Sequence, residues 1–195
     1  MKTMNKAAVL LLLAALIKSP ALLAYESAYP MAETGSVEII RLPAARLLEA
    51  RMNGNYFQGS NKMFMRLFDY IKTNDIAMTV PVEAQLENAG MRFYLGSDAP
   101  TKLDNTDEVG IVELPQRQVL RLGGKGSYSE SNINQTIADL YEWLNQQSEW
   151  QADGEAYAVF WNGPFTPWFM KRFEIHLPVR ATDARLVSGL PANGD

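Results

Sequence analysis

The chain of 195 residues carries one histidine, His176, and no cysteine. This excludes a histidine-rich metal site, a thiolate metal site and a cysteine nucleophile. A serine–histidine–aspartate triad would have to use His176. The surrounding strand alternates, with Phe173, Ile175 and Leu177 on one face and Glu174 and His176 on the other. The alternation predicts that His176 is a solvated residue on a polar face, with metal ligation as the alternative.

An aromatic cluster offers a second kind of chemistry, the binding of a flat apolar molecule. Trp161, Phe165, Trp168 and Phe169 fall within one predicted loop, followed by Met170. Loops seldom collect so many aromatic residues for packing alone, so we interpret the cluster as a binding wall. The alternative is a loop that folds down over the end of a sheet.

Methionines accompany these aromatic residues. Met63 and Met65 fall on a predicted helix, Met78 follows that helix, and Met170 lies in the aromatic loop. Thioethers are soft and adaptable, which suits contact with a planar ligand. For Met78 we favour a core position, because it shares a face with other apolar strand residues. The other three could either fill the core or contact a ligand.

Cations flank the same two segments and could pair with the carboxylates of an anionic ligand: Lys62, Arg66, Lys171 and Arg172. Solvated surface charge is the alternative for each of them. The chain shows no phosphate-binding loop, dinucleotide fingerprint, zinc-protease motif or nucleophile elbow. We therefore expect a binding protein without catalytic residues and without a bound metal site of its own.

An internal repeat organises the elements that must position these residues. The segment 37–43 aligns with 109–115 at an offset of 109 − 37 = 72, and the match continues through Gly54 with Gly126 and Tyr56 with Tyr128. Each copy is read as strand, strand, helix, strand, strand. Two such units predict an α+β fold in which mostly antiparallel strands form one curved sheet or open barrel with two helices packed on it.

The helices are predicted from apolar residues at helical spacing. The first covers the apolar positions of 64–71, with Ser60 as its cap, and the second covers those of 133–144, with Ser129 or Ser131 as its cap. After the first helix, alternating apolar residues predict one half-buried strand over 78–87.

The N-terminus has the layout of a secretory signal peptide. A short basic region precedes the apolar run 7–17, and Ala24 supplies a small residue at the expected cleavage point. We expect a signal peptide over 1–24, a polar lead-in over 25–35 and a loose tail over 181–195. An uncleaved membrane anchor is the alternative. The net charge of −4 is unfavourable for nucleic-acid binding, so we expect a periplasmic or secreted monomer without a nucleic-acid partner.

Three segments together resemble the SOUL haem-binding family. Thr73–Val82 contains a Met-Thr-x-Pro-Val strand directly after the first helix, and Gly126–Ser129 resembles the Gly-x-Tyr turn of that family. Trp161–Glu174 resembles its closing loop, although Trp161-Asn-Gly-Pro replaces the usual Tyr-Asp-Pro-Pro. The resemblance covers about 25–180, the predicted domain. Members are usually intracellular, whereas this chain has an export signal.

The resemblance implies a distorted antiparallel β-barrel made of duplicated ββαββ units and flanked by two helices. It also implies non-covalent binding of haem or another tetrapyrrole in a shallow apolar groove between the first helix and the last loop. An enzyme or binding protein for another flat apolar molecule is the alternative. The resemblance does not favour axial ligation by His176, because a tryptophan often occupies this position in the family and the ligand histidine of some members lies elsewhere. The expected groove residues are Lys62, Met63, Phe64, Met65, Arg66, Trp168, Phe169, Met170 and Lys171.

Overall fold

The computed structural model describes residues 26–163 and 165–182. The predicted signal peptide and almost all of the predicted tail lie outside these residues. The elements are β1 (Glu26–Ser27), β2 (Val37–Leu42), β3 (Ala45–Arg51), α2 (Tyr56–Thr73), β4 (Thr79–Val80), β5 (Val82–Gln85), β6 (Gly90–Tyr94), β7 (Gly110–Leu114), β8 (Arg117–Lys125), α3 (Glu130–Asn145), β9 (Trp150–Ala152), β10 (Tyr157–Phe160), the 3₁₀ turn η1 (Trp168–Met170) and β11 (Arg172–Ala181).

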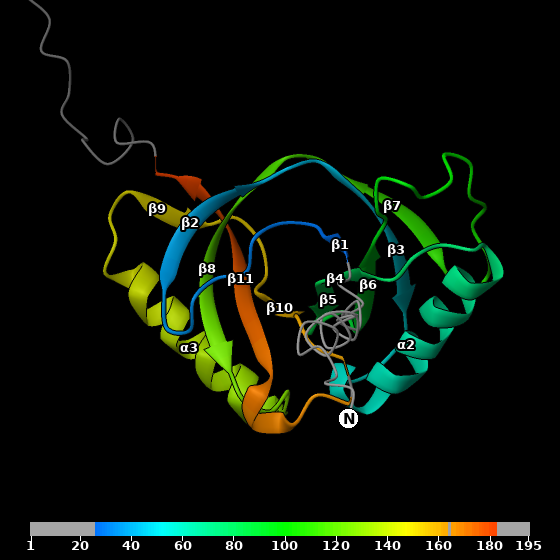
Figure 1. The fold of residues 1–195 in the computed structure, drawn as a ribbon. Helices are drawn as coiled ribbons and strands as arrows, with labels where there is room; N and C mark the ends of the chain where they lie inside the picture. The colour runs from blue at the N-terminus through cyan, green and yellow to red at the C-terminus, as the bar shows by residue number, and fades with distance from the viewer. Residues whose placement is uncertain (1–25, 164, 183–195) are drawn as a thin grey trace, which may run out of the picture.

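Eight of the strands form one antiparallel sheet that curls into a half-barrel, with α2 and α3 on its outside (Figure 1). The strand order is β2-β8-β11-β10-β5-β6-β3-β7, and β9 adds to β11. This confirms the predicted α+β class. The predicted strand 78–87 is interrupted at Pro81, which has no N–H to donate to a ladder, so the chain forms β4 and β5 instead of one strand.

The strand order shows the predicted duplication directly. Each unit contributes the same arrangement, β3-β6-β5 in the first copy and β8-β11-β10 in the second. The first strands are exchanged, because β2 pairs with β8 and β7 pairs with β3. Gly54 and Gly126, equivalent in the repeat, both have φ of +103°, a backbone conformation that L side chains rarely adopt. Tyr56 and Tyr128 follow them, and both rings lie against Phe160.

The two helices begin at polar caps. Asn55 caps α2 by accepting a hydrogen bond from the backbone N–H of Phe57, so the prediction of Ser60 as the cap was wrong. The helix starts one turn earlier than its apolar pattern suggests, because Tyr56 already faces the core. Ser129 caps α3 as predicted, accepting from the N–H of Asn132. No helix among the described residues is both long and apolar enough to cross a bilayer.

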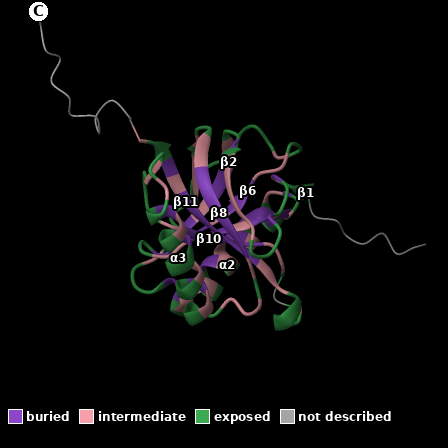
Figure 2. Ribbon diagram, turned by 90° about the vertical axis from the view of Figure 1, so that its left-hand side faces the viewer, coloured by how far each residue is buried: buried purple, intermediate pink, exposed green. Residues whose placement is uncertain are grey.

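The sheet carries packed side chains on both faces, and the buried residues gather along its strands (Figure 2). The larger core lies on the outer face, where residues such as Met63 and Leu67 of α2 and Leu140 of α3 pack on the strands. A smaller cluster, which includes Leu47 and Tyr157, lies on the concave inner face. The half-barrel is therefore a packed structure on both sides.

An N-terminal strap, residues 26–36, covers the inner face (Figure 1). Arg121 donates a hydrogen bond to the Pro30 carbonyl at 2.8 Å, and Gly35 N–H donates to the Gly123 carbonyl at 2.7 Å. A Cβ at Gly123 would lie 2.0 Å from the Glu33 carbonyl oxygen, so the strap touches β8 where only glycine fits. The prediction that 25–35 is a polar lead-in outside the structured region was wrong for the described residues of this segment.

Candidate functional site

The predicted groove residues on α2 divide into buried and exposed side chains. Met63 is fully buried in the outer core, and Phe64 is half-buried against Phe93 with ring centroids 5.5 Å apart. Lys62 and Met65 point to solvent, and half of the Met65 side chain is exposed. Met63 and Met65 thus lie on opposite sides of the helix, Met63 in the core and Met65 in solvent.

Arg66 is not a free cation. Its guanidinium lies 2.9 Å from a carboxylate oxygen of Glu108 and donates to the backbone carbonyl of Arg51 at 3.2 Å. An anionic ligand at Arg66 would therefore have to share it with Glu108. Since Glu108 is largely solvent-exposed, the ion pair is a weak competitor for such a ligand.

A half-exposed aromatic edge of α2 contains the predicted groove residue Phe64 and two residues that were not predicted as ligand contacts, Phe57 and Phe68. Phe57, Phe64 and Phe68 lie at helical spacing and are each only half-buried, and the rings of Phe64 and Phe68 stack with centroids 5.8 Å apart. Met65 extends this edge into solvent. The sequence signal was present in the i, i+7, i+11 spacing, but the same spacing is typical of a core face.

The last loop presents the most exposed apolar side chains of the described residues. The exposed fractions are 99% for Phe165, 66% for Trp168, 63% for Phe169 and 59% for Met170. These values rule out the alternative of a loop folded down over the end of the sheet. Lys171 lies beside them, and its ammonium sits 4.8 Å from the centroid of the Tyr128 ring.

The predicted groove residues lie on two segments of the structure, α2 and the last loop. No hydrogen bond, ion pair or aromatic contact joins the groove residues of α2 to those of the loop, as far as the described residues show. A ligand that touches both segments would therefore contact two sets of side chains that are not bonded to each other.

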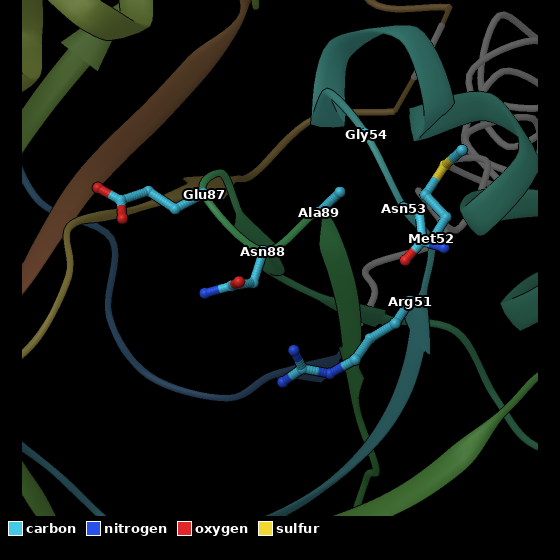
Figure 3. Close-up of a pocket in the computed structure, with 7 residues that line it drawn as sticks. All are labelled: Arg51, Met52, Asn53, Gly54, Glu87, Asn88 and Ala89. Atoms are coloured by element: carbon cyan, nitrogen blue, oxygen red, sulfur yellow. The ribbon is translucent and has the colours of Figure 1, made fainter.

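Two shallow cavities lie next to the two ends of α2. The first cavity, of about 500 Å³, lies between the C-terminal end of β3 and the β5–β6 turn (Figure 3). It is lined by Arg51, Met52, Asn53, Gly54, Glu87, Asn88 and Ala89. The other, about 490 Å³, lies at the C-terminal end of α2 and includes Tyr70 and Asp104. Neither contains a predicted groove residue. The polar side chains of the first cavity do not suit a flat apolar ligand.

His176 is fully buried on the inner face, so the prediction of a solvated residue was wrong although its face was assigned correctly. Its Nε2 lies 2.6 Å from a Glu174 carboxylate oxygen and its Nδ1 lies 3.3 Å from the Tyr157 hydroxyl. The strap closes over this face, and the ring of Tyr29 lies 5.8 Å from the imidazole. With both ring nitrogens engaged and no exposed atoms, His176 is not placed to ligate a bound molecule.

Glu174 is the centre of this buried network. It accepts hydrogen bonds from Trp161 Nε1 at 2.8 Å and from the Ala32 N–H of the strap at 2.7 Å, and Arg121 lies 3.5 Å away. Burial raises the pKa of Glu174, but the hydrogen bond from His176 and the other donors outweigh it, so the pKa is lowered overall. The folded protein therefore holds this carboxyl group as a carboxylate.

A second buried carboxylate, Glu83, joins the same network. The Tyr94 hydroxyl donates to Glu83 at 2.5 Å and Arg117 donates to it at 2.6 Å. Arg117 also lies 3.4 Å from the Tyr157 hydroxyl, which links Glu83 to His176. Burial raises the pKa of Tyr94 and of Tyr157, so both phenols remain protonated donors. This network of hydrogen bonds and ion pairs joins β5, β6, β8, β10 and β11 on the inner face.

A profile of the SOUL heme-binding protein family matches residues 24–178. The chain belongs to this family. The match covers more than three quarters of the sequence, and it includes α2, the last loop and the strands of the half-barrel up to residue 178 of β11. The SOUL family is a family of haem-binding proteins, which supports a tetrapyrrole as the ligand and a binding role for the chain.

Solved structures resemble the SOUL half-barrel at low sequence identity. The C-terminal domain of EcmrR matches with a TM-score of 0.61 and 12% identity, covering 77% of this chain and 100% of that domain. In an EcmrR–DNA complex the match covers 75% of this chain but only 58% of the EcmrR chain, with a TM-score of 0.60 and 12% identity. A hydrolase from Listeria innocua matches with a TM-score of 0.51 and 15% identity, covering 76% and 94%. These likenesses establish the fold alone. No curated protein matches the sequence significantly.

Proposed function

We propose that the protein is an exported haem or tetrapyrrole carrier that binds its ligand on the apolar surfaces of α2 and the last loop. One observation carries the proposal. Seven large apolar side chains are exposed among the described residues, and five of them lie on these two segments: Met65, Phe165, Trp168, Phe169 and Met170. The family resemblance pointed to the same two segments.

The residues present suit a tetrapyrrole. Aromatic rings of α2 and the loop offer flat apolar contact, Met65 and Met170 offer exposed thioethers, and Lys62 and Lys171 offer cations for propionates. A bound haem would supply an iron centre. The protein groups would hold and orient the macrocycle through apolar contact, and the two cations would set the direction of its charged edge.

We expect moderate affinity. Burial of on the order of 400 Å² of apolar surface contributes roughly 10 kcal/mol at about 25 cal/mol per Å². The loss of translational and rotational freedom offsets several kcal/mol or more. The remainder corresponds to a Kd near about 1 μM. Histidine ligation would add to this, but both nitrogens of His176 are engaged inside the inner face. A methionine or tyrosine remains available as a weak axial ligand.

A haemin titration followed by absorbance tests the proposal. We expect the wild type to shift the Soret band with a Kd near about 1 μM, and His176→Gln to give the same spectrum. The double variant Trp168→Ala/Phe169→Ala should bind at least about tenfold more weakly. Tyr141→Ala, which removes an exposed aromatic ring from α3, is the matched control and should bind as the wild type does.

Other outcomes would contradict the proposal. Loss of binding in His176→Gln alone, in a variant that stays folded, would place the ligand on the inner face. No Soret shift in the wild type would refute haem binding. Time-dependent loss of the haemin chromophore would favour the alternative of an enzyme acting on a flat apolar compound.

Export is tested separately. The basic, apolar and small residues of 1–24 support it. Intact-mass measurement on protein from its native cell should show a chain that starts near Tyr25. A soluble cytoplasmic chain that keeps Met1 would contradict export without affecting the haemin result.

A further inference from the structure

The tip of the last loop, which the proposed function assigns to the ligand surface, is also exposed enough to contact a second partner. Phe165 is 99% exposed and touches nothing that would hold it, and Trp168 is 66% exposed. Phe169 and Met170 continue the same apolar surface. Soluble proteins rarely leave a contiguous group of large apolar side chains in water, so such a surface marks a contact with a protein or a membrane.

The base of the loop is fixed to the sheet. Asn162 accepts a hydrogen bond from Arg172 N–H at 2.6 Å, and the Tyr128 hydroxyl donates to the Arg172 carbonyl at 2.7 Å. Gly126 N–H donates to the Lys171 carbonyl at 2.9 Å. These bonds close the loop across its neck. The apolar tip is therefore held outward on a fixed base.

The charge around the loop is opposite to that of the chain as a whole. The net charge is −4, yet no acidic residue occurs from 161 to 173. Lys171 and Arg172 lie in the loop neck, and Lys125 pairs with Arg172 across the β8–β11 ladder. Arg172 also donates to the Thr34 hydroxyl.

The N-termini of both helices lie near this neck and add positive potential to it. Two carboxylates lie close to the neck: Glu174, which accepts a hydrogen bond from Trp161 on the inner face, and Glu130 at the start of α3, to which Asn55, the cap of α2, donates at 3.1 Å. This contact brings the two helix N-termini together, and each carries the positive end of a helix dipole. Tyr128, which holds the loop neck, lies just before α3.

We propose that this loop docks the protein on an anionic lipid bilayer. The aromatic tip enters the interfacial region, where amphipathic aromatic rings are favoured, and the three cations face the headgroups. The mixture of an apolar tip and a basic neck distinguishes a membrane surface from a protein partner, which would be recognised by a drier and less charged surface. Docking needs no bound haem, although it uses loop residues that the proposed function assigns to the ligand, so haem-free protein tests it separately.

Vesicle co-sedimentation with haem-free protein tests the docking surface. We expect the wild type to sediment with vesicles of phosphatidylglycerol and phosphatidylcholine at low salt, and to be released as salt screens the charges. Phe165→Ser/Trp168→Ser should lower vesicle affinity about tenfold or more, and Lys171→Gln about fivefold. Tyr141→Ser on α3 is the matched control and should sediment as the wild type does. The circular dichroism of each variant should be unchanged, because Phe165, Trp168 and Tyr141 are exposed and Lys171 is only half-buried.

Three outcomes would overturn the proposal. The first is no sedimentation of the wild type with anionic vesicles, and the second is equal sedimentation of wild type and the Phe165/Trp168 variant. The third is concentration-dependent self-association in solution that the same variant abolishes without any vesicle binding, since a second copy would then cover the loop. A failed haemin titration would not change how any of these three outcomes is interpreted.

Discussion

Replacing His176 by alanine removes a side chain that is entirely enclosed by β10, β11 and the strap. The change deletes the 2.6 Å contact with Glu174 and the 3.3 Å contact with the Tyr157 hydroxyl. A hydrogen bond to a charged group contributes about 1.5–3 kcal/mol, and the space left by the ring adds a cavity cost. We expect the free energy of unfolding to fall by about 3–5 kcal/mol. His176→Gln is the matched control, because its amide can still donate toward Glu174, and it should lose about 1–2 kcal/mol.

Urea denaturation at pH 7, followed by circular dichroism, measures both variants. With a slope of about 2 kcal/mol per M, the alanine variant should unfold at a urea concentration lower by roughly 2 M. Its slope should stay close to that of the wild type. A loss below about 0.5 kcal/mol is what surface substitutions give, and it would refute the buried position of His176 and the role of the strap in covering it.

Three further predictions concern the same face and the repeat. The pKa of Glu174 is lowered on folding, so the stabilising contribution of this carboxylate is present above about pH 4.5 and is lost as the pH falls through its folded-state pKa. The free energy of unfolding of Glu174→Gln should therefore fall less steeply on acidification than that of the wild type. Urea titrations between pH 3 and 6 measure this difference. Gly123→Ala forces the strap away from β8 at the Glu33 carbonyl, so it should lower the free energy of unfolding by about 1–3 kcal/mol and speed proteolysis of the strap. Gly163→Ala has open space around the added methyl group and should change neither quantity. Gly126→Ala meets no neighbour closely but keeps φ at +103°, so thermal unfolding should show a loss of about 1–2 kcal/mol, and no loss would indicate that the turn relaxes.

The sequence predicted those parts of the fold whose apolar residues recur at a regular spacing or whose segments repeat. Alternation in β11 assigned the faces of Ile175 and His176 correctly, and the repeat predicted the symmetric strand order. Ser129 was identified as a cap because it directly precedes the apolar pattern of α3. Asn55 was missed because the first turn of α2 carries Tyr56 in the core, before the regular pattern becomes visible.

The strap could not be predicted because its apolar residues show no helical or strand periodicity. It buries Tyr29 and Ala32, and several of its backbone groups bond to side chains of distant strands such as Arg121 and Glu174. If the strap is not considered, the alternating pattern of β11 predicts that its polar face is exposed to solvent. This explains why His176 was predicted to be solvated. The sequence prediction placed the ligand surface on two segments and grouped Met63 with Met65 on the first of them. Residues two positions apart on a helix point in nearly opposite directions, and Met63 lies in the core with Leu67 whereas Met65 lies in solvent.

The exchanged first strands have a consequence for the origin and assembly of the molecule. Because β2 completes the second unit and β7 completes the first, neither unit can close its sheet from its own segment. A single ancestral unit would have needed a second copy of itself, so the present chain is equivalent to a homodimer fused end to end. Folding during synthesis must likewise wait for β8 before β2 finds its neighbour. A chain severed between β6 and β7 should yield two fragments that are unfolded separately and regain the half-barrel when mixed.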